Sequence, residues 1–137
     1  MRSGATHLTT AALVRLAALH VAWGRGSSFP LADRDDLAEA VIGTSSIPGP
    51  LPCFGVAAGL LVAASAVQNR PRWPSKLRRL AMTGIAGVLG GRGVLGLAGM
   101  TSVVSPDSDG ARFRRLDRRF YAPLCLGLAA GVLWAGR

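Results

Sequence analysis

The chain has 137 residues, of which half are hydrophobic and 17% are charged, whereas soluble domains usually carry roughly 25% charged residues. A soluble protein of this size could not bury so much apolar surface, so the composition excludes an ordinary soluble globular domain. The formal net charge of +9 would suggest a nucleic-acid partner in a soluble protein, but here the charges lie between apolar segments. This placement favours membrane lipids as partners and argues against nucleic acid.

Four apolar segments are predicted to cross the membrane, at residues 8–24, 51–67, 80–104 and 121–136. Crossing a hydrocarbon core about 30 Å thick takes roughly 20 helical residues. The segments lack the two-residue alternation of barrel strands, and backbone polar groups cannot remain unpaired in lipid. The predicted fold class is therefore all-α, a single domain (residues 1–137) forming an integral membrane bundle of four transmembrane helices.

The first connection contains a segment, residues 33–41, that is predicted to form a short surface helix. Acidic side chains occupy its first turn, and apolar residues follow at Leu37, Ala40 and Val41. Acidic residues near a helix N-terminus interact favourably with the helix dipole, and the apolar spacing fits one helical face.

If all four segments cross, the N-terminus, the second connection and the C-terminus share one side. That side holds seven Lys and Arg residues and no acid, while the other side holds seven Arg residues and all seven acids. The count of basic residues is therefore tied, but the second connection, residues 70–79, is short and densely basic, which favours its side as cytoplasmic. We expect a multi-pass protein of the bacterial cytoplasmic (inner) membrane with both termini in the cytoplasm.

Glycine spacing predicts close helix packing. Gly55 and Gly59 form a GxxxG pair in the second segment, and Gly127 and Gly131 form another in the fourth. Each pair would let a neighbouring helix approach, within the bundle or in a homo-oligomer. In the third segment glycine recurs at every third position from residue 84 to 99, a row that drifts by about 60° per step and so winds around the helix. This pattern predicts a central helix with several neighbours.

Two arginines, Arg15 and Arg92, lie inside predicted spans, where a charge costs on the order of 3 kcal/mol. No acidic residue lies inside any predicted span. Their partners must therefore be backbone carbonyls, carboxylates reaching in from connections, lipid phosphates or an anionic ligand. Glycines on both sides of Arg92 leave space around its side chain, whereas Arg15 lies nearer the N-terminal side and could extend toward lipid headgroups.

Five polar residues are expected to converge in one half of the membrane: His20, Glu39, Arg92, Asp117 and Tyr121. In a structural interpretation, Asp117 or Glu39 neutralises Arg92, and His20 donates to a carbonyl. In a functional interpretation, the group forms a cationic pocket for the head of an anionic amphiphile. A proton relay is a third interpretation, because such a relay needs at least a histidine beside a carboxylate in the membrane.

The functional interpretation assigns roles to these residues and their neighbours. Whether the protein is an enzyme is left open. The catalytic candidates for proton transfer are His20, Asp117 and Tyr121, and the ligand-binding candidates are Arg92, Arg118, Arg119, Trp23 and Glu39.

The two cysteines, Cys53 and Cys125, fall on the same predicted side, where an oxidising compartment would let them form a disulfide. No CxxC pair is present, and the two histidines and two cysteines show no metal-ligand spacing. No nucleotide-binding or nucleophile-elbow motif occurs in a suitable context. The sequence therefore predicts no metal and no cofactor.

Three stretches resemble a family of small bacterial four-helix membrane proteins known only as a domain of unknown function. They are residues 20–24 (HVAWG), 92–96 (RGVLG) and 113–126, whose LDRRFYxPLCL run is the most specific part. The resemblance covers nearly the whole chain and implies the four-span fold. It supplies no activity, and this chain has Ala122 where family members often carry serine. The family-pattern positions that it implies are His20, Trp23, Arg92, Asp117, Arg118, Arg119, Tyr121 and Cys125.

Three functions remain open from the sequence. The first is a membrane protein that binds or modifies an anionic amphiphile, such as a lipid or a prenyl compound. The second is a non-catalytic structural or interaction subunit, whose glycine faces and basic connection dock a membrane partner. The third is a small transporter, which four short spans could form only as an oligomer.

Overall fold

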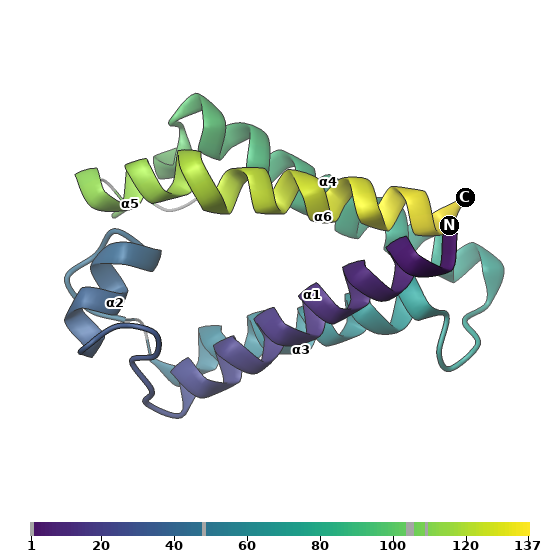
Figure 1. Cartoon of the computed structure of the whole chain (residues 1–137), viewed down its shortest axis with the longest axis horizontal. Coiled ribbons are helices and arrows are strands. Elements are labelled where there is room, and N and C mark those ends of the chain that lie inside the picture. The colour runs from purple at the N-terminus through teal and green to yellow at the C-terminus, as the bar shows by residue number, and fades with distance from the viewer. Residues whose placement is uncertain (1, 48, 104–105, 109) are drawn as a thin grey trace.

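The structure, a computed structural model, describes residues 2–47, 49–103, 106–108 and 110–137, and its regular elements there are all helical. Four long helical rods lie lengthwise together, and each runs antiparallel to the next one along the chain (Figure 1). Three of them are α1 (Arg2–Gly24), α3 (Pro50–Gln68) and α4 (Ser75–Ala98). The fourth rod is continuous and contains α5 (Ala111–Leu116), the π turn η2 (Asp117–Tyr121) and α6 (Ala122–Gly136).

Both termini lie at one end of the bundle, and the first and third connections lie at the other (Figure 1). The first connection contains α2 (Arg34–Val41), and the third contains the 3₁₀ turn η1 (Thr101–Val103). Asp33 caps α2, because its side chain accepts the Asp36 N–H at 2.8 Å. The predicted short helix in the first connection is thus confirmed, and its own residues Leu37, Ala38 and Ala40 are buried.

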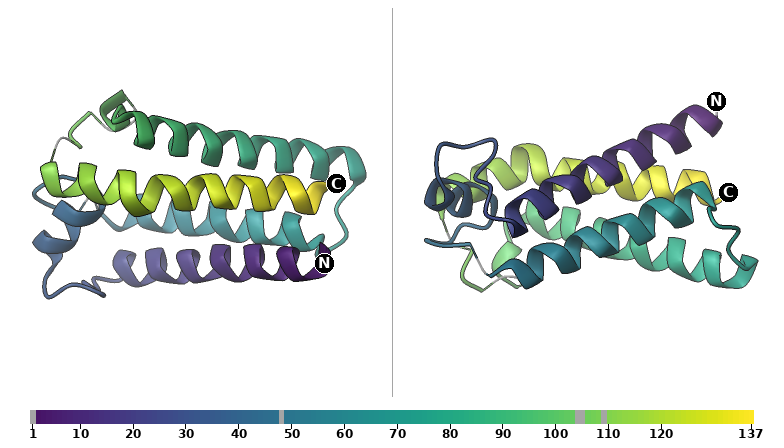
Figure 2. Two further views of the ribbon diagram at one scale, coloured as in Figure 1. Left: turned by 45° about the horizontal axis from the view of Figure 1, so that its top comes forward. Right: turned by 90° about the horizontal axis from the view of Figure 1, so that it is seen from below.

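The rods pack as two pairs, α1 beside α3 and α4 beside the α5–α6 rod (Figure 2). The pairs are closest near the termini, and α2 lies at the end where they separate (Figure 1). The core contains Leu13, Val67, Met82, Leu128 and Val132. Many large apolar side chains instead face outward, and Leu51, Leu80 and Val88 are 71–81% exposed. Such an apolar exterior is expected of a protein surrounded by lipid.

Three helices are long and apolar enough to cross a membrane: Pro50–Gln68, Ser75–Ala98 and Ala111–Gly136. This supports a multi-pass membrane protein, and three of the four predicted spans fall in helices that could cross a membrane. The remaining predicted span lies in α1, which has the length but also carries Arg15, His7 and His20 among its apolar residues. Its membrane crossing therefore stays a prediction.

Two predicted segment boundaries differ from the helices observed. The third segment was expected to run to residue 104, but α4 ends at Ala98 because Gly99 adopts a left-handed conformation with φ of 72° and donates its N–H to Gly96. The fourth segment was expected to begin at residue 121, but its helix begins at Ala111. The charged residues between 111 and 120 do not interrupt the helix, because most of their side chains are exposed on its outer surface.

At the terminal end, Arg78 joins two helix C-termini. Its Nε donates to Ala66 O at 2.8 Å, and its Nη2 donates to Val67 O at 3.3 Å and to Ala135 O at 3.2 Å. The carbonyls in the last turn of a helix lack intrahelical partners and carry the negative end of the helix dipole. Arg78 therefore fastens α3 to α6.

The GxxxG glycines differ in what they meet. Gly131 lies against Thr9 of α1, so a side chain at this position would collide with the Thr9 hydroxyl. Gly55, Gly59 and Gly127 have open space where a Cβ would be. Of these four glycines, only Gly131 allows a neighbouring helix of the described chain to approach closely.

Candidate functional site

Arg92 and Asp117 form an ion pair between α4 and the fourth rod, in which the carboxylate is buried and the guanidinium is partly exposed. Arg92 Nη2 lies 2.7 Å from Asp117 Oδ1, and Nη1 lies 3.2 Å from Oδ2. Thr101 Oγ1 donates to the same Oδ2 at 2.6 Å. Asp117 is only 1% exposed, and two parallel charge-assisted bonds to arginine are a strong geometry for a carboxylate. The guanidinium of Arg92 is therefore neutralised within the protein, as the structural interpretation predicted.

The π turn and two glycines make this ion pair fit. The turn begins at Asp117, whose carbonyl accepts the N–H of Ala122 five residues later, and such turns change the direction of the side chains that follow. A Cβ on Gly96 would lie 2.7 Å from Ala122 Cβ and 2.9 Å from Asp117 Oδ2. A Cβ on Gly93 would lie 2.9 Å from Ala122 O. Only glycine at these two positions lets α4 approach the rod this closely.

His20 and Trp23 form a second group, near the end of α1. The Nδ1 of His20 donates to Leu16 O at 2.8 Å, which agrees with the carbonyl bond expected in the structural interpretation. With a proton on Nδ1, the neutral ring presents Nε2 as an acceptor. The two rings lie 4.9 Å apart, and Trp23 Nε1 donates to Phe29 O at 2.7 Å. These bonds hold both rings beside the first connection.

Tyr121 belongs to a third group, which ties the fourth rod to α2. Its hydroxyl donates to Ala40 O at 3.0 Å. Nearby, Arg112 Nη1 lies 3.6 Å from Asp36 Oδ1 and 3.9 Å from Glu39 Oε2. Glu39 thus lies at the exposed contact between α2 and α5, where ion pairs contribute little to stability.

The five residues that were expected to converge therefore lie in three separate groups at one end of the bundle. Within the ranges that the structure describes, no hydrogen bond or ion pair joins His20 to Arg92, Asp117 or Tyr121. Arg92 and Asp117 bond to each other, and His20 and Tyr121 each bond to a backbone carbonyl.

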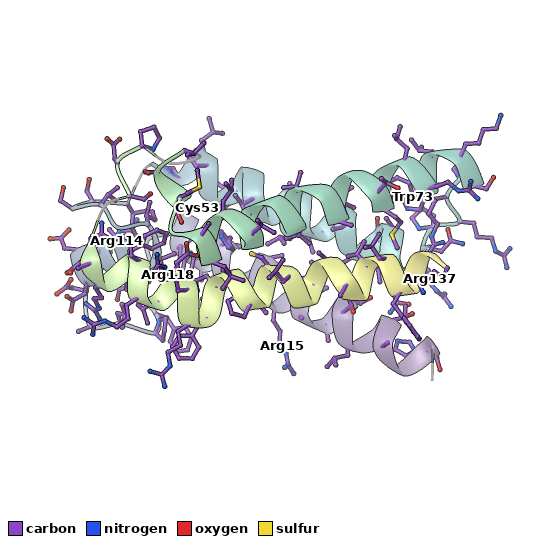
Figure 3. The ribbon with its side chains drawn as sticks, turned by 90° about the horizontal axis from the view of Figure 1, so that it is seen from above. Arg15, Cys53, Trp73, Arg114, Arg118 and Arg137 are labelled. Carbon is purple, nitrogen blue, oxygen red and sulfur yellow. The ribbon has the colours of Figure 1, made fainter. Side chains whose placement is uncertain are left out.

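The two remaining candidate arginines lie outside these groups. Arg118 lies over Gly99, at the C-terminal end of α4 (Figure 3), a position where a cation interacts favourably with the helix dipole. Arg119 is exposed and lies 5.8 Å from the ring centre of Phe120. Neither has a described bond to the Arg92–Asp117 pair.

Two apolar cavities lie beside α2 and share Trp23, Leu37 and Val41 as walls. The smaller cavity, of about 230 Å³, is also lined by His20, Ile42, Ile47, Pro52, Cys53 and Val56. The larger cavity, of about 430 Å³, is also lined by Leu19, Pro30, Leu31, Ala40, Arg112, Arg115, Leu116 and Tyr121. Binding sites for small molecules typically combine such apolar walls with a few polar groups.

Arg112 and Arg115 supply the charged groups of the larger cavity, and neither was predicted from the sequence as a site residue. The helix was predicted to begin only at residue 121, so these arginines were assigned to a connection. Arg112, Arg115 and Leu116 stand at positions i, i+3 and i+4 of α5, which places them on one helical face. That spacing was the signal in the sequence that could have identified them.

Cys53 and Cys125 are both free thiols, so the disulfide considered from the sequence is absent from the structure. Cys53 lines the smaller cavity. No group of three or more His, Cys, Asp or Glu residues suited to a metal ion occurs in the described part of the chain.

Comparison with known proteins identifies a family but no activity. The model of a family described as "Protein of unknown function (DUF3995)" matches residues 13–132. No curated protein and no solved structure matches the chain.

Proposed function

The chain belongs to the DUF3995 family of proteins of unknown function, and we propose that it binds an anionic amphiphile at the α2 end of the bundle. In this proposal the apolar tail occupies the two cavities beside α2, and the headgroup lies at Arg112 and Arg115. The observation that carries the proposal is the adjacency of apolar cavities to two arginines on one face of α5, of which Arg115 is exposed and Arg112 partly exposed.

The size and chemistry of the cavities suit a hydrocarbon tail. The larger cavity, about 430 Å³, falls within the range of roughly 300–1,000 Å³ typical of small-molecule sites. Leu37 and Val41 project from α2 into both cavities, so α2 covers the tail. Burying each methylene group of a tail contributes about 0.8 kcal/mol, which favours a ligand with a chain of several carbons.

The headgroup assignment follows from which arginines are already neutralised. Arg92 is held by the buried Asp117 carboxylate, so it is a poor partner for a second anion. Arg112 has only long contacts to Asp36 and Glu39, at 3.6 and 3.9 Å. Arg115 is exposed and has no ion pair among the described residues. Arg115 and Arg112 therefore replace Arg92 as the proposed headgroup ligands.

Binding is favoured over modification of the ligand. Of the catalytic candidates, Asp117 is buried in its ion pair, and the Tyr121 hydroxyl donates to Ala40 O. His20 lines the smaller, apolar cavity, where it would meet the tail and not the headgroup. General acid–base catalysis requires the group to lie within hydrogen-bond reach of the reacting atom.

We further propose that all four rods cross the bacterial inner membrane, with both termini in the cytoplasm. Contacts at both ends of α1 support its crossing, since His7 Nδ1 lies 3.2 Å from Gln68 Nε2 and Gly24 packs against Phe54. α1 thus accompanies α3 along its length. The densely basic second connection supports the cytoplasmic side for the terminal end.

Native mass spectrometry in detergent tests the binding proposal, with a single-chain lysophosphatidic acid as the probe and lysophosphatidylcholine as its zwitterionic counterpart. We expect the anionic probe to bind more strongly, and Arg115→Gln to remove most of this preference. Arg114→Gln is the matched control, because it removes the same charge from the same helix but does not line the cavity. Val41→Trp, which places an indole in both cavities, should abolish binding of either probe. Equal binding of both probes to all variants would refute the proposal.

A further inference from the structure

Arg15 is a charged side chain on the outer face of the bundle. It belongs to an exposed row on α1 that also contains Leu8, Ala11 and Ala18. Figure 3 shows its side chain pointing away from the neighbouring helices. No hydrogen bond or ion pair connects Arg15 to any residue in the described ranges.

Contacts between α1 and α3 establish the depth of Arg15. His7 lies level with Gln68, at the end of α3, and Gly24 lies level with Phe54, near its beginning. Arg15 falls about midway between His7 and Gly24, so it is level with the middle of α3. This inference rests on the proposed crossing of all four rods: α3 is one of the three apolar helices long enough to cross a membrane, and in that arrangement this level lies at the centre of the bilayer.

Neither the described part of the chain nor the lipid offers a partner at this depth. The described acids lie at the α2 end of the molecule, and Asp117 is bonded to Arg92. The lipid phosphates lie beyond a half-core of about 15 Å, of which an extended arginine side chain covers only about half. An arginine left unpaired at the centre of a membrane helix costs at least about 2.5–3.5 kcal/mol.

We propose that the outer face of α1 binds a transmembrane helix of a different protein, one that carries a carboxylate near its middle. Ionic pairing with Arg15 would neutralise the charge at the depth where it is most unfavourable. Ala11 and Ala18 lie on either side of Arg15 on this face, and small residues let helix backbones approach closely in lipid. The chain is therefore a subunit of a membrane complex as well as a lipid-binding protein.

A second copy of this chain is a poor occupant of the same face. Copies inserted in one membrane share their orientation, so two α1 helices would meet with their Arg15 side chains at the same depth. Like charges repel strongly where the dielectric constant is low. The complementary charge must therefore come from another chain.

Energy transfer in phosphatidylcholine vesicles tests this proposal with a defined partner. The full-length protein carries the donor fluorophore, and synthetic leucine–alanine transmembrane peptides carry the acceptor. The peptides differ only at their central residue, which is Asp, Asn or Leu. We expect the Asp peptide to associate most strongly. Arg15→Leu should weaken its association about tenfold, which corresponds to the 1–2 kcal/mol of an interhelical polar bond.

Two variants and one further measurement make the outcome decisive. Arg119→Leu is the matched control, since it removes another exposed arginine from the α2 end of the bundle. Arg15→Lys should retain most of the association with the Asp peptide, and unchanged helix content by circular dichroism will show that each variant is folded. Equal transfer to the Asp and Leu peptides would overturn the proposal. Transfer between donor- and acceptor-labelled copies of the protein that depends on Arg15 would also overturn it, in favour of a homo-oligomer.

Discussion

Arg92 and Asp117 bond through the two Nη atoms of the guanidinium and both carboxylate oxygens, at 2.7 and 3.2 Å, and so join α4 to the fourth rod. Each residue alone would be an expensive charge in a membrane protein. Together, and with Thr101 donating to the same carboxylate, they form a neutral unit that fixes how the two helices meet. Because Asp117 neutralises Arg92, the arginines of α5 are the better placed to bind an anion.

The first prediction concerns the energetics of this ion pair. Arg92→Leu should destabilise the protein by on the order of 3 kcal/mol, because it leaves the buried Asp117 carboxylate without its partner, and Asp117→Leu should destabilise it less, because Arg92 is partly exposed. The double variant should recover much of that loss, since two apolar side chains can replace a buried pair at little net cost. Thermal unfolding in detergent, arranged as a double-mutant cycle, measures the coupling. Additive losses would show that the pair is not an energetic unit.

A second prediction concerns the glycines of α4. Gly96→Ala should lower the unfolding temperature markedly, because its Cβ would collide with Ala122 and with the Asp117 carboxylate. Gly87→Ala is the control on the same helix, where a Cβ meets open space. It should be neutral or stabilise the helix by up to about 1 kcal/mol through helix propensity. Equal effects of the two substitutions would contradict the packing described here.

Arg78 supplies a third prediction, at the terminal end. Arg78→Met should destabilise the protein by about 2 kcal/mol, because carbonyls of α3 and α6 lose a charged donor. Arg79→Met removes the same charge from an exposed position and should change the unfolding temperature little. The comparison is made by thermal unfolding in detergent. If both variants unfold alike, the basic cluster acts only through its total charge.

The fourth prediction concerns the cover over the cavities. Tyr121→Phe removes the hydroxyl that donates to Ala40 O, at a cost of about 1 kcal/mol. We expect faster hydrogen exchange in residues 34–41, measured by mass spectrometry, and unchanged exchange in the middle of α3. Unchanged exchange in residues 34–41 would mean that packing of Leu37 and Ala38 alone holds α2 in place.

The long helices were predictable because apolar runs bounded by polar residues identify membrane helices directly. Their ends were less predictable, because apolar residues continue past Gly99, whose left-handed backbone ends α4. The fourth helix begins ten residues before its predicted start, at Ala111 and not at Tyr121. Charged residues that face outward from a helix do not interrupt it, so polarity is a poor guide to where a helix begins.

The candidate site was predicted in part. The sequence named Asp117 or Glu39 as the partner of Arg92 and a carbonyl as the partner of His20, and the bonds to Asp117 and to a carbonyl are present. Arg112 and Arg115 were missed because residues 111–116 were assigned to a connection. Without the helix α5, the face that these two residues share could not be recognised. The π turn at Asp117, which depends on tertiary packing, left no recognisable pattern in the sequence.

Fluorescence of Trp23 tests the central claim, that an anionic amphiphile occupies the cavities beside α2. The chain has three tryptophans, so Trp73→Phe with Trp134→Phe leaves Trp23 alone in the walls of both cavities. The probes are a lysophosphatidic acid and a lysophosphatidylcholine with brominated tails, which quench indole on contact. We predict saturable quenching at lower concentration by the anionic probe, with the difference removed by Arg115→Gln and kept by Arg114→Gln. Equal quenching by both probes, or none by either, would contradict the account.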